Sequence, residues 1–257
     1  MIFKKAEINY LFFFLFLSSL SVAQTRYIHV VVALCDNKNQ GIVPVPAGIG
    51  NGQDPASNLY WGCGYGVKTF FKKQTDWKLI KKINNPSSEI YERLIFKHKT
   101  TNIYLVADAY DGAEIKQTIT DFLTYSAGLS KIKIQVDSFS ILAGGNADLI
   151  AYVGHNGLMD FSLDTYPIQS DYKKRDAIIL ACKSKNYFSF YIKKTGAYPL
   201  IWTTHLMCPE AYTLDASIDA WVKKESPTAI QEKAAQAYHQ YQKCGIKGAR
   251  KLLVTGY

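Results

Sequence analysis

Two side chains capable of acyl-transfer chemistry come directly after apolar, strand-like segments. His155 follows residues 147–153 (ADLIAYV) after one glycine, and Cys182 follows residues 177–181 (AIILA) at once. If the two segments are neighbouring parallel strands, both side chains leave the sheet at the same edge. A thiolate attacks carbonyl carbons, and an imidazole can accept the thiol proton and then protonate the leaving group. The pattern therefore predicts a Cys–His dyad.

Other residues compete for the same roles. His205 follows a further apolar segment, residues 200–204, and is the alternative partner for the thiol. The chain has five cysteines, an odd number, so an exported form keeps at least one unpaired thiol. Neither a CxxC pair nor zinc-type spacing occurs, and we expect no metal site. Disulfides among the other four cysteines are possible, and the sequence does not determine which cysteines would pair.

Strand-like and helix-like segments alternate along the chain, as in an α/β protein with a mostly parallel sheet and helices on both faces. Buried strands are predicted at 27–34, 103–107, 147–153, 177–181 and 200–204, and helices at 57–72, 111–125, 184–194, 209–223 and 227–243. Residues 77–83 and 90–97 fit either strands or short helices.

The chain begins as a secretory precursor does. Lys4 and Lys5 precede a short apolar run, and residues 21–23 (SVA) place small side chains before Gln24. We expect cleavage there, with residues 1–23 a signal peptide and residues 24–257 one α/β domain. The run is shorter than the roughly 20 apolar residues that span a bilayer, so no membrane span is expected. The predicted location is periplasmic or extracellular.

Composition argues against several other classes. The net charge of +9 is spread over scattered lysine pairs rather than clustered arginines, so nucleic-acid binding is not expected. The loop AGIGNGQ lacks the GxGxxG spacing of a dinucleotide site, and no GxSxG, HExxH or Walker pattern occurs. We therefore expect no cofactor.

The two strand-end motifs together resemble those of the caspase, gingipain, legumain and clostripain group of cysteine peptidases. In that group a hydrophobic strand ends in His-Gly and a later one in Ala-Cys; here the segments read LIAYVGHNG and AIILACKS, in the same order. The resemblance covers about residues 103–206, with residues 27–34 as the first strand. It implies a three-layer sandwich of the caspase–hemoglobinase type that hydrolyses peptide bonds through a thioester.

The resemblance also implies roles for backbone groups. The oxyanion would be held by the N–H groups of Cys182 and of Asn156 or Gly157; Asn156 stands where the group has its glycine. Leu180 occupies the position, two before the cysteine, that is polar in caspases and legumain, so their specificity does not carry over.

Asp36, Asp108, Leu180 and His205 are candidates for the wall of a specificity pocket. Asp36 and Asp108 follow predicted strands, and an acidic wall there would favour basic substrates. Two alternatives to a peptidase remain. One is a catalytically inactive secreted relative that binds or supports other molecules. The other is a non-proteolytic thiol hydrolase or transferase acting on amides or thioesters.

Overall fold

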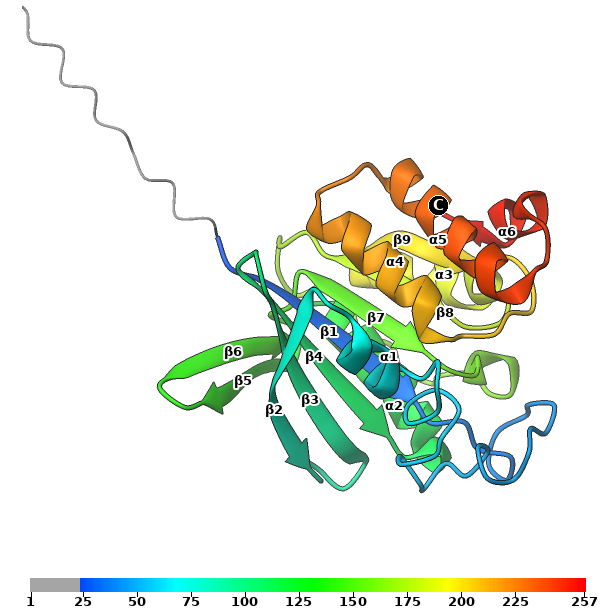
Figure 1. The fold of residues 1–257 in the computed structure, drawn as a ribbon, viewed down its shortest axis with the longest axis horizontal. Coiled ribbons are helices and arrows are strands. Elements are labelled where there is room, and N and C mark those ends of the chain that lie inside the picture. The colour runs from blue at the N-terminus through cyan, green and yellow to red at the C-terminus, as the bar shows by residue number, and fades with distance from the viewer. Residues whose placement is uncertain (1–23) are drawn as a thin grey trace, which may run out of the picture.

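The computed structural model describes residues 24–257, which fold around a central eight-stranded sheet (Figure 1). The predicted signal peptide, residues 1–23, lies outside the described residues. The strands are β1 (Arg26–Ala33), β2 (Trp77–Asn84), β3 (Ile90–His98), β4 (Ile103–Tyr110), β5 (Lys131–Val136), β6 (Phe139–Gly144), β7 (Leu149–Val153), β8 (Asp176–Leu180), β9 (Tyr198–Thr203) and β10 (Leu253–Val254). The helices are α1 (Val67–Lys73), α2 (Ile115–Ser126), α3 (Ser184–Thr195), α4 (Ala211–Val222), α5 (Pro227–Gln242) and α6 (Ile246–Leu252), with 3-10 turns η1 (Gly112–Glu114) and η2 (Gly157–Met159).

The sheet is mostly parallel, which confirms the α/β class predicted from the sequence. Its strand order is β10-β9-β8-β7-β1-β4-β3-β2. The five strands from β9 to β4 run parallel, while β10, β3 and β2 are antiparallel to their neighbours. After β1 the chain runs to the edge strand β2, comes back through β3 to β4 beside β1, and later adds β7 on the other side of β1. The strand order therefore switches between β1 and β7, the place where open α/β sheets form ligand crevices.

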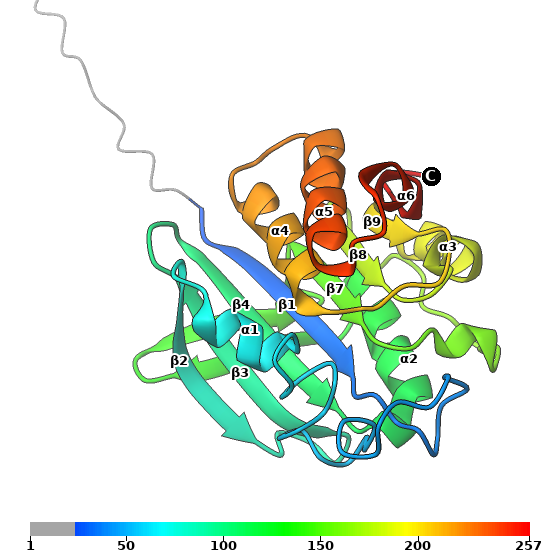
Figure 2. The same cartoon turned by 45° about the vertical axis from the view of Figure 1, so that its right-hand side comes forward.

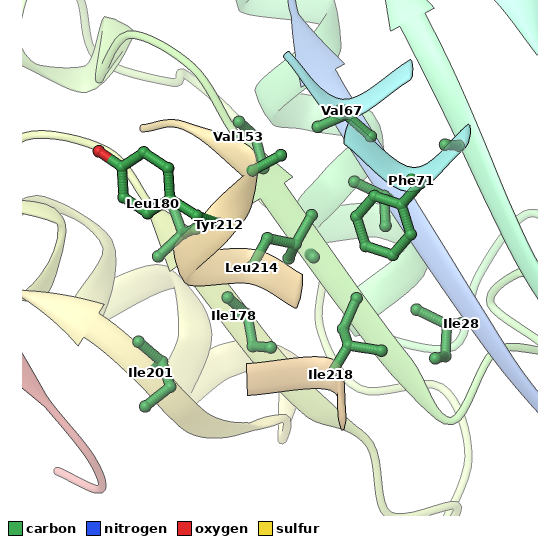
Figure 3. Close-up of a cluster of buried hydrophobic side chains, with 14 of the residues drawn as sticks. Ile28, Val67, Phe71, Val153, Ile178, Leu180, Ile201, Tyr212, Leu214 and Ile218 are labelled. Carbon is green, nitrogen blue, oxygen red and sulfur yellow. The ribbon is translucent and has the colours of Figure 1, made fainter. Parts of the chain in front are cut away.

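Two layers cover the sheet. On one face α1, α4 and α5 pack over the strands, and in Figure 3 Leu214 and Ile218 of α4 lie over Ile178 of β8. On the other face α2 and α3 pack against β1, β7 and β8, while the β5–β6 hairpin covers β3 and β4. Figure 2 shows α2 behind the sheet and α4 and α5 in front of it. Both faces of the central strands are thus buried, as their continuous apolar sequences predict.

Most predicted segments are found within a few residues of their expected ends, but the segment 57–72 is helical only from Val67. The preceding residues form turns because the chain folds tightly on itself there. A Cβ at Gly62 would lie 2.0 Å from the Ala56 carbonyl oxygen, so the segment requires glycine at this point. The two ambiguous segments are strands β2 and β3.

The β5–β6 hairpin, α6 and β10 were not predicted. None of the helices within residues 24–257 has the length and apolar character needed to cross a bilayer. Residues 34–66 form a long loop that leaves the carboxyl end of β1 and wraps around that edge of the sheet (Figure 1, Figure 2). The loop therefore lies where β7 and β8 also end.

Candidate active site

β7 and β8 are hydrogen-bonded parallel neighbours, so the two predicted reactive side chains leave adjacent strand ends. The register pairs Val153 with Leu180, the last residues of the two strands. Asn156 then links the two ends, since its side-chain amide donates to the Cys182 carbonyl at 2.6 Å. The adjacency on which the predicted dyad depended is therefore present.

His155 is held in a fixed orientation just after β7. Gly154 turns the chain with a φ of +151°, and a Cβ there would lie 2.9 Å from the Ala33 carbonyl oxygen. The His155 side chain is 5% exposed, and its Nε2 lies 2.6 Å from Oδ2 of Asp160. The Tyr152 hydroxyl donates to the His155 carbonyl at 2.6 Å. Both ring and backbone are therefore anchored.

Asp160 orients the imidazole and is itself positioned by two elements. It directly follows the 3-10 turn η2, and its Oδ2 also accepts the backbone N–H of Gly41 at 3.1 Å. A carboxylate on Nε2 selects the neutral tautomer in which Nε2 carries the proton. Nδ1 is then the basic nitrogen, and no hydrogen bond within residues 24–257 occupies it.

Cys182 sits in the short turn that joins β8 to α3. Lys183 adopts a left-handed conformation with φ 49°, and its N–H donates to the His205 carbonyl at 2.9 Å. The Cys182 side chain is half-buried, and Sγ accepts the backbone N–H of Met207 at 3.4 Å. That N–H is a donor for negative charge on sulfur. Sγ also lies 3.6 Å from the Met207 carbonyl oxygen.

His155 and Cys182 line one cavity of about 520 Å³ at the carboxyl ends of the parallel strands. Among the described residues no hydrogen bond joins Sγ to the imidazole, although both groups line the same cavity. Such bonds are often long in unliganded enzymes and shorten when substrate binds. The remaining walls come from the loop after β1, from Leu59 and Tyr60, from Met159, and from residues 206–210.

The backbone groups expected to hold an oxyanion fall into two kinds. The Gly157 N–H already donates to the His155 carbonyl at 3.2 Å. The N–H groups of Asn156 and Cys182 have no hydrogen-bond acceptor within residues 24–257. Cys182 lines the cavity, whereas Asn156 is fully buried and does not, so the Cys182 N–H is the donor available to a developing negative charge.

Asp36 does not line the cavity, because its carboxylate organises the loop after β1. It accepts the backbone N–H groups of Lys38 and Asn39 and the side-chain amides of Asn39 and Gln53. Burial opposes its ionisation, but these donors outweigh burial and lower the pKa of Asp36. Its effect on the cavity is therefore indirect, through the loop that forms one wall.

Asp108 also lies away from the cavity, because β4 continues past it to Tyr110. Its side chain is fully buried and accepts two hydrogen bonds from Arg93, at 2.7 and 2.6 Å. Nε2 of His29 lies 3.0 Å from the same carboxylate. The sequence placed Asp108 at a strand end because the apolar pattern stops there, whereas the strand continues into a buried ionic cluster.

The two other predicted wall residues do not line the cavity either. Leu180 is fully buried and points into the core beneath α4 (Figure 3). The His205 side chain is exposed, and only its carbonyl contributes, by accepting the Lys183 N–H. Of the two histidines weighed as partners for Cys182, His155 is the one that shares the cavity with it.

Three features of the site were missed from the sequence: the orienting carboxylate of Asp160, the loop segment 41–45, and Glu210 at the cavity wall. A carboxylate a few residues after a candidate histidine was a usable signal for Asp160. The walls were not predictable, because they depend on which loops cross the sheet edge.

All five cysteines lie in the described part of the chain and are unpaired. Cys35 is fully buried, and burial raises the pKa of its thiol to about 11. Cys244 is exposed on the turn between α5 and α6. These two thiols are useful references for the reactivity of Cys182.

Searches against protein-family models, curated proteins and solved structures find no match to this chain.

Proposed function

We propose that this protein is an exported cysteine peptidase in which Cys182 is the nucleophile and His155 the acid–base partner. The carrying observation is that both side chains, from the ends of adjacent parallel strands, line one cavity. Asp160 acts as a positioning residue, since its carboxylate lies 2.6 Å from the ring nitrogen opposite the basic one. A thiol that shares a cavity with a carboxylate-bound imidazole is the arrangement that supports this proposal.

The reaction proceeds in two steps. The Cys182 thiol transfers its proton to Nδ1 of His155, and the thiolate adds to the peptide carbonyl carbon. The oxyanion is bound by the N–H group of Cys182. The intermediate expels the amine, which takes the proton from His155, and a thioester remains. Water then loses a proton to His155 and attacks the thioester, which releases the acid and restores the thiol.

The caspase-type sandwich belongs to the same proposal. It is supported by a mostly parallel sheet with helices on both faces, and by the chain order of a histidine strand followed by its neighbouring cysteine strand. Export is supported by the sequence pattern of residues 1–23 alone. N-terminal sequencing of the secreted chain tests it: a start at Gln24 is expected, and a retained Met1 would contradict export.

Thiol labelling tests the dyad directly. In the full chain at neutral pH, iodoacetamide followed by peptide mapping should modify Cys182 at least tenfold faster than exposed Cys244. His155→Ala should bring Cys182 to the Cys244 rate, whereas His205→Ala, the matched change at a histidine outside the cavity, should have no effect. Equal rates at both cysteines in the unaltered protein would overturn the proposal in favour of an inactive relative.

A further inference from the structure

The walls of the cavity are largely apolar, and several of its apolar side chains are exposed to solvent. Val43 is 88% exposed, Leu206 66% and Met159 37%, and they come from three separate segments that meet around the dyad. Exposed apolar side chains gathered around a concave site are typical of ligand-binding surfaces. Since each belongs to a different segment, the fold places them together at this site.

The apolar walls are held in place before any ligand arrives. The Asn37 side chain makes two hydrogen bonds to the Val45 backbone, donating to its carbonyl at 2.7 Å and accepting its N–H at 3.0 Å. Asp160 fixes Gly41 in the same loop. On the opposite wall the Met207 backbone contacts Cys182 through Sγ. The segments that carry the apolar walls are therefore hydrogen-bonded to Asp160 and Cys182.

The cavity has little charge with which to attract a basic or acidic side chain. Glu210 is the one carboxylate among the described residues that line it. Its Oε2 accepts the Tyr212 hydroxyl at 2.9 Å and the Gln242 side-chain amide at 3.2 Å. Burial raises the pKa of the Glu210 carboxyl, so its charge is also less favoured. An acidic wall selective for lysine or arginine is therefore absent from the described cavity.

We infer that the cavity binds a large apolar side chain of a peptide substrate, on the residue whose carbonyl Cys182 attacks. This rests on the proposed peptidase function and names its substrate class. The volume of about 520 Å³ lies within the roughly 300–1,000 Å³ of small-molecule sites, so it accommodates a leucine or phenylalanine side chain with adjoining peptide. Because Cys182 lines the same cavity, the substrate side chain next to the attacked carbonyl is the one that contacts the apolar walls.

The test compares peptides that differ only at that residue. Leucine and phenylalanine peptides should be cleaved with kcat/KM at least about tenfold above arginine, aspartate and asparagine peptides. Leu206→Ser should lower kcat/KM for the apolar peptides about threefold to tenfold. Ile168→Ser is the matched control, since Ile168 is 64% exposed and outside the cavity.

Failure of this inference differs from failure of the peptidase proposal. Cleavage that prefers arginine peptides and disappears in Glu210→Gln would overturn the apolar specificity while leaving the dyad intact. Preference for a fatty-acyl thioester over every peptide would also overturn it. If labelling shows no His155-dependent reactivity, the inference is tested by the binding of leucine and arginine peptides to Cys182→Ala, which does not cleave them. Tighter binding of the leucine peptide, weakened by adding Leu206→Ser, supports the inference. Equal binding of the two peptides overturns it.

Discussion

Two buried histidines on the same sheet, each beside an aspartate, differ in what their rings face. His29 lies within β1, is fully buried, and uses both ring nitrogens: Nε2 contacts Asp108 at 3.0 Å and Nδ1 accepts the Gly144 N–H at 2.9 Å. His155 lies past the end of β7, uses one nitrogen for Asp160, and lines a cavity. The same pair of residue types therefore lies in the core in one place and at a cavity in the other, where we propose that it supplies a base.

Position along the strand accounts for the difference. A mid-strand side chain faces the covering layer. The His29 ring stacks on Tyr125 of α2, with ring centroids 5.0 Å apart, and its Nδ1 accepts the N–H of Gly144 at the end of β6. A side chain beyond the strand end can line the crevice at the switch in strand order, as His155 does. We call His29, Asp108 and Arg93 the closed cluster. His155 and Asp160, beside Cys182, form the open cluster. Four experiments test whether these two clusters differ in function as they do in surroundings.

The largest expected effect is on catalysis at the open cluster. His155→Ala should lower kcat/KM for a leucine peptide by about 10²–10⁴-fold, because proton transfer to and from the thiol is lost. The melting temperature should stay near that of the unaltered protein. Steady-state hydrolysis and thermal unfolding measure the two. His239→Ala on the surface of α5 is the control, and full activity of His155→Ala would remove the basis for the comparison.

Removing the carboxylate of the closed cluster should instead reduce stability. Asp108→Ala leaves Arg93 buried without its partner, and the free energy of unfolding should fall by about 3–5 kcal/mol. Urea denaturation measures it. The matched change is Asp164→Ala, which breaks an exposed pair with Lys116 at 3.6 Å and should cost about 1 kcal/mol or less. Equal losses in the two variants would show that the buried cluster is not structural.

The carboxylate of the open cluster should affect the rate with little effect on stability. Asp160→Asn should lower kcat about tenfold to a hundredfold, the equivalent of one charge-assisted hydrogen bond, with KM little changed. Asp160→Glu should restore part of the rate if orientation of the ring is the cause. An unchanged kcat in Asp160→Asn would exclude the positioning role.

The smallest effect is a dependence of stability on acid pH. Burial disfavours the charge on Asp108, but hydrogen bonds from Arg93 and His29 outweigh burial and hold the pKa of Asp108 below its usual range. This stabilisation is complete above the unfolded value of about 3.9 and is lost as pH falls through the folded value. Unfolding free energies measured between pH 4 and pH 2 should therefore decline less steeply in Asp108→Asn, by up to about 1.4 kcal/mol per pH unit. Parallel slopes would contradict this.

Sequence patterns located the two strands of the site because buried parallel strands are continuously apolar. The runs before Gly154 and Cys182 end where the chain must meet solvent, and polar residues follow at once. The same logic misplaced Asp108, since an internal ionic cluster interrupts the apolar pattern of β4 without ending the strand. Local composition does not distinguish a strand end from a buried charge whose partner is on another strand.

The β5–β6 hairpin was missed although its sequence alternates. Residues 131–136 (KIKIQV) place every second side chain on one face, and Ile134 and Val136 pack against Ile95 of β3 and Val106 of β4. The hairpin depends on this packing, because two strands alone bury too little surface to be stable. Its placement was therefore decided by the sheet that it covers.

The sequence by itself determined the mostly parallel α/β sheet and the two strand ends that carry His155 and Cys182, because apolar periodicity and chain order are local properties. Only the tertiary structure decided that the two ends are adjacent, that Asp160 orients the imidazole, and that the walls around them are apolar. Those features arise where the loop after β1 and the segment after β9 cross the same sheet edge. Contacts between segments far apart in the chain depend on how the layers pack, which no short stretch of sequence specifies.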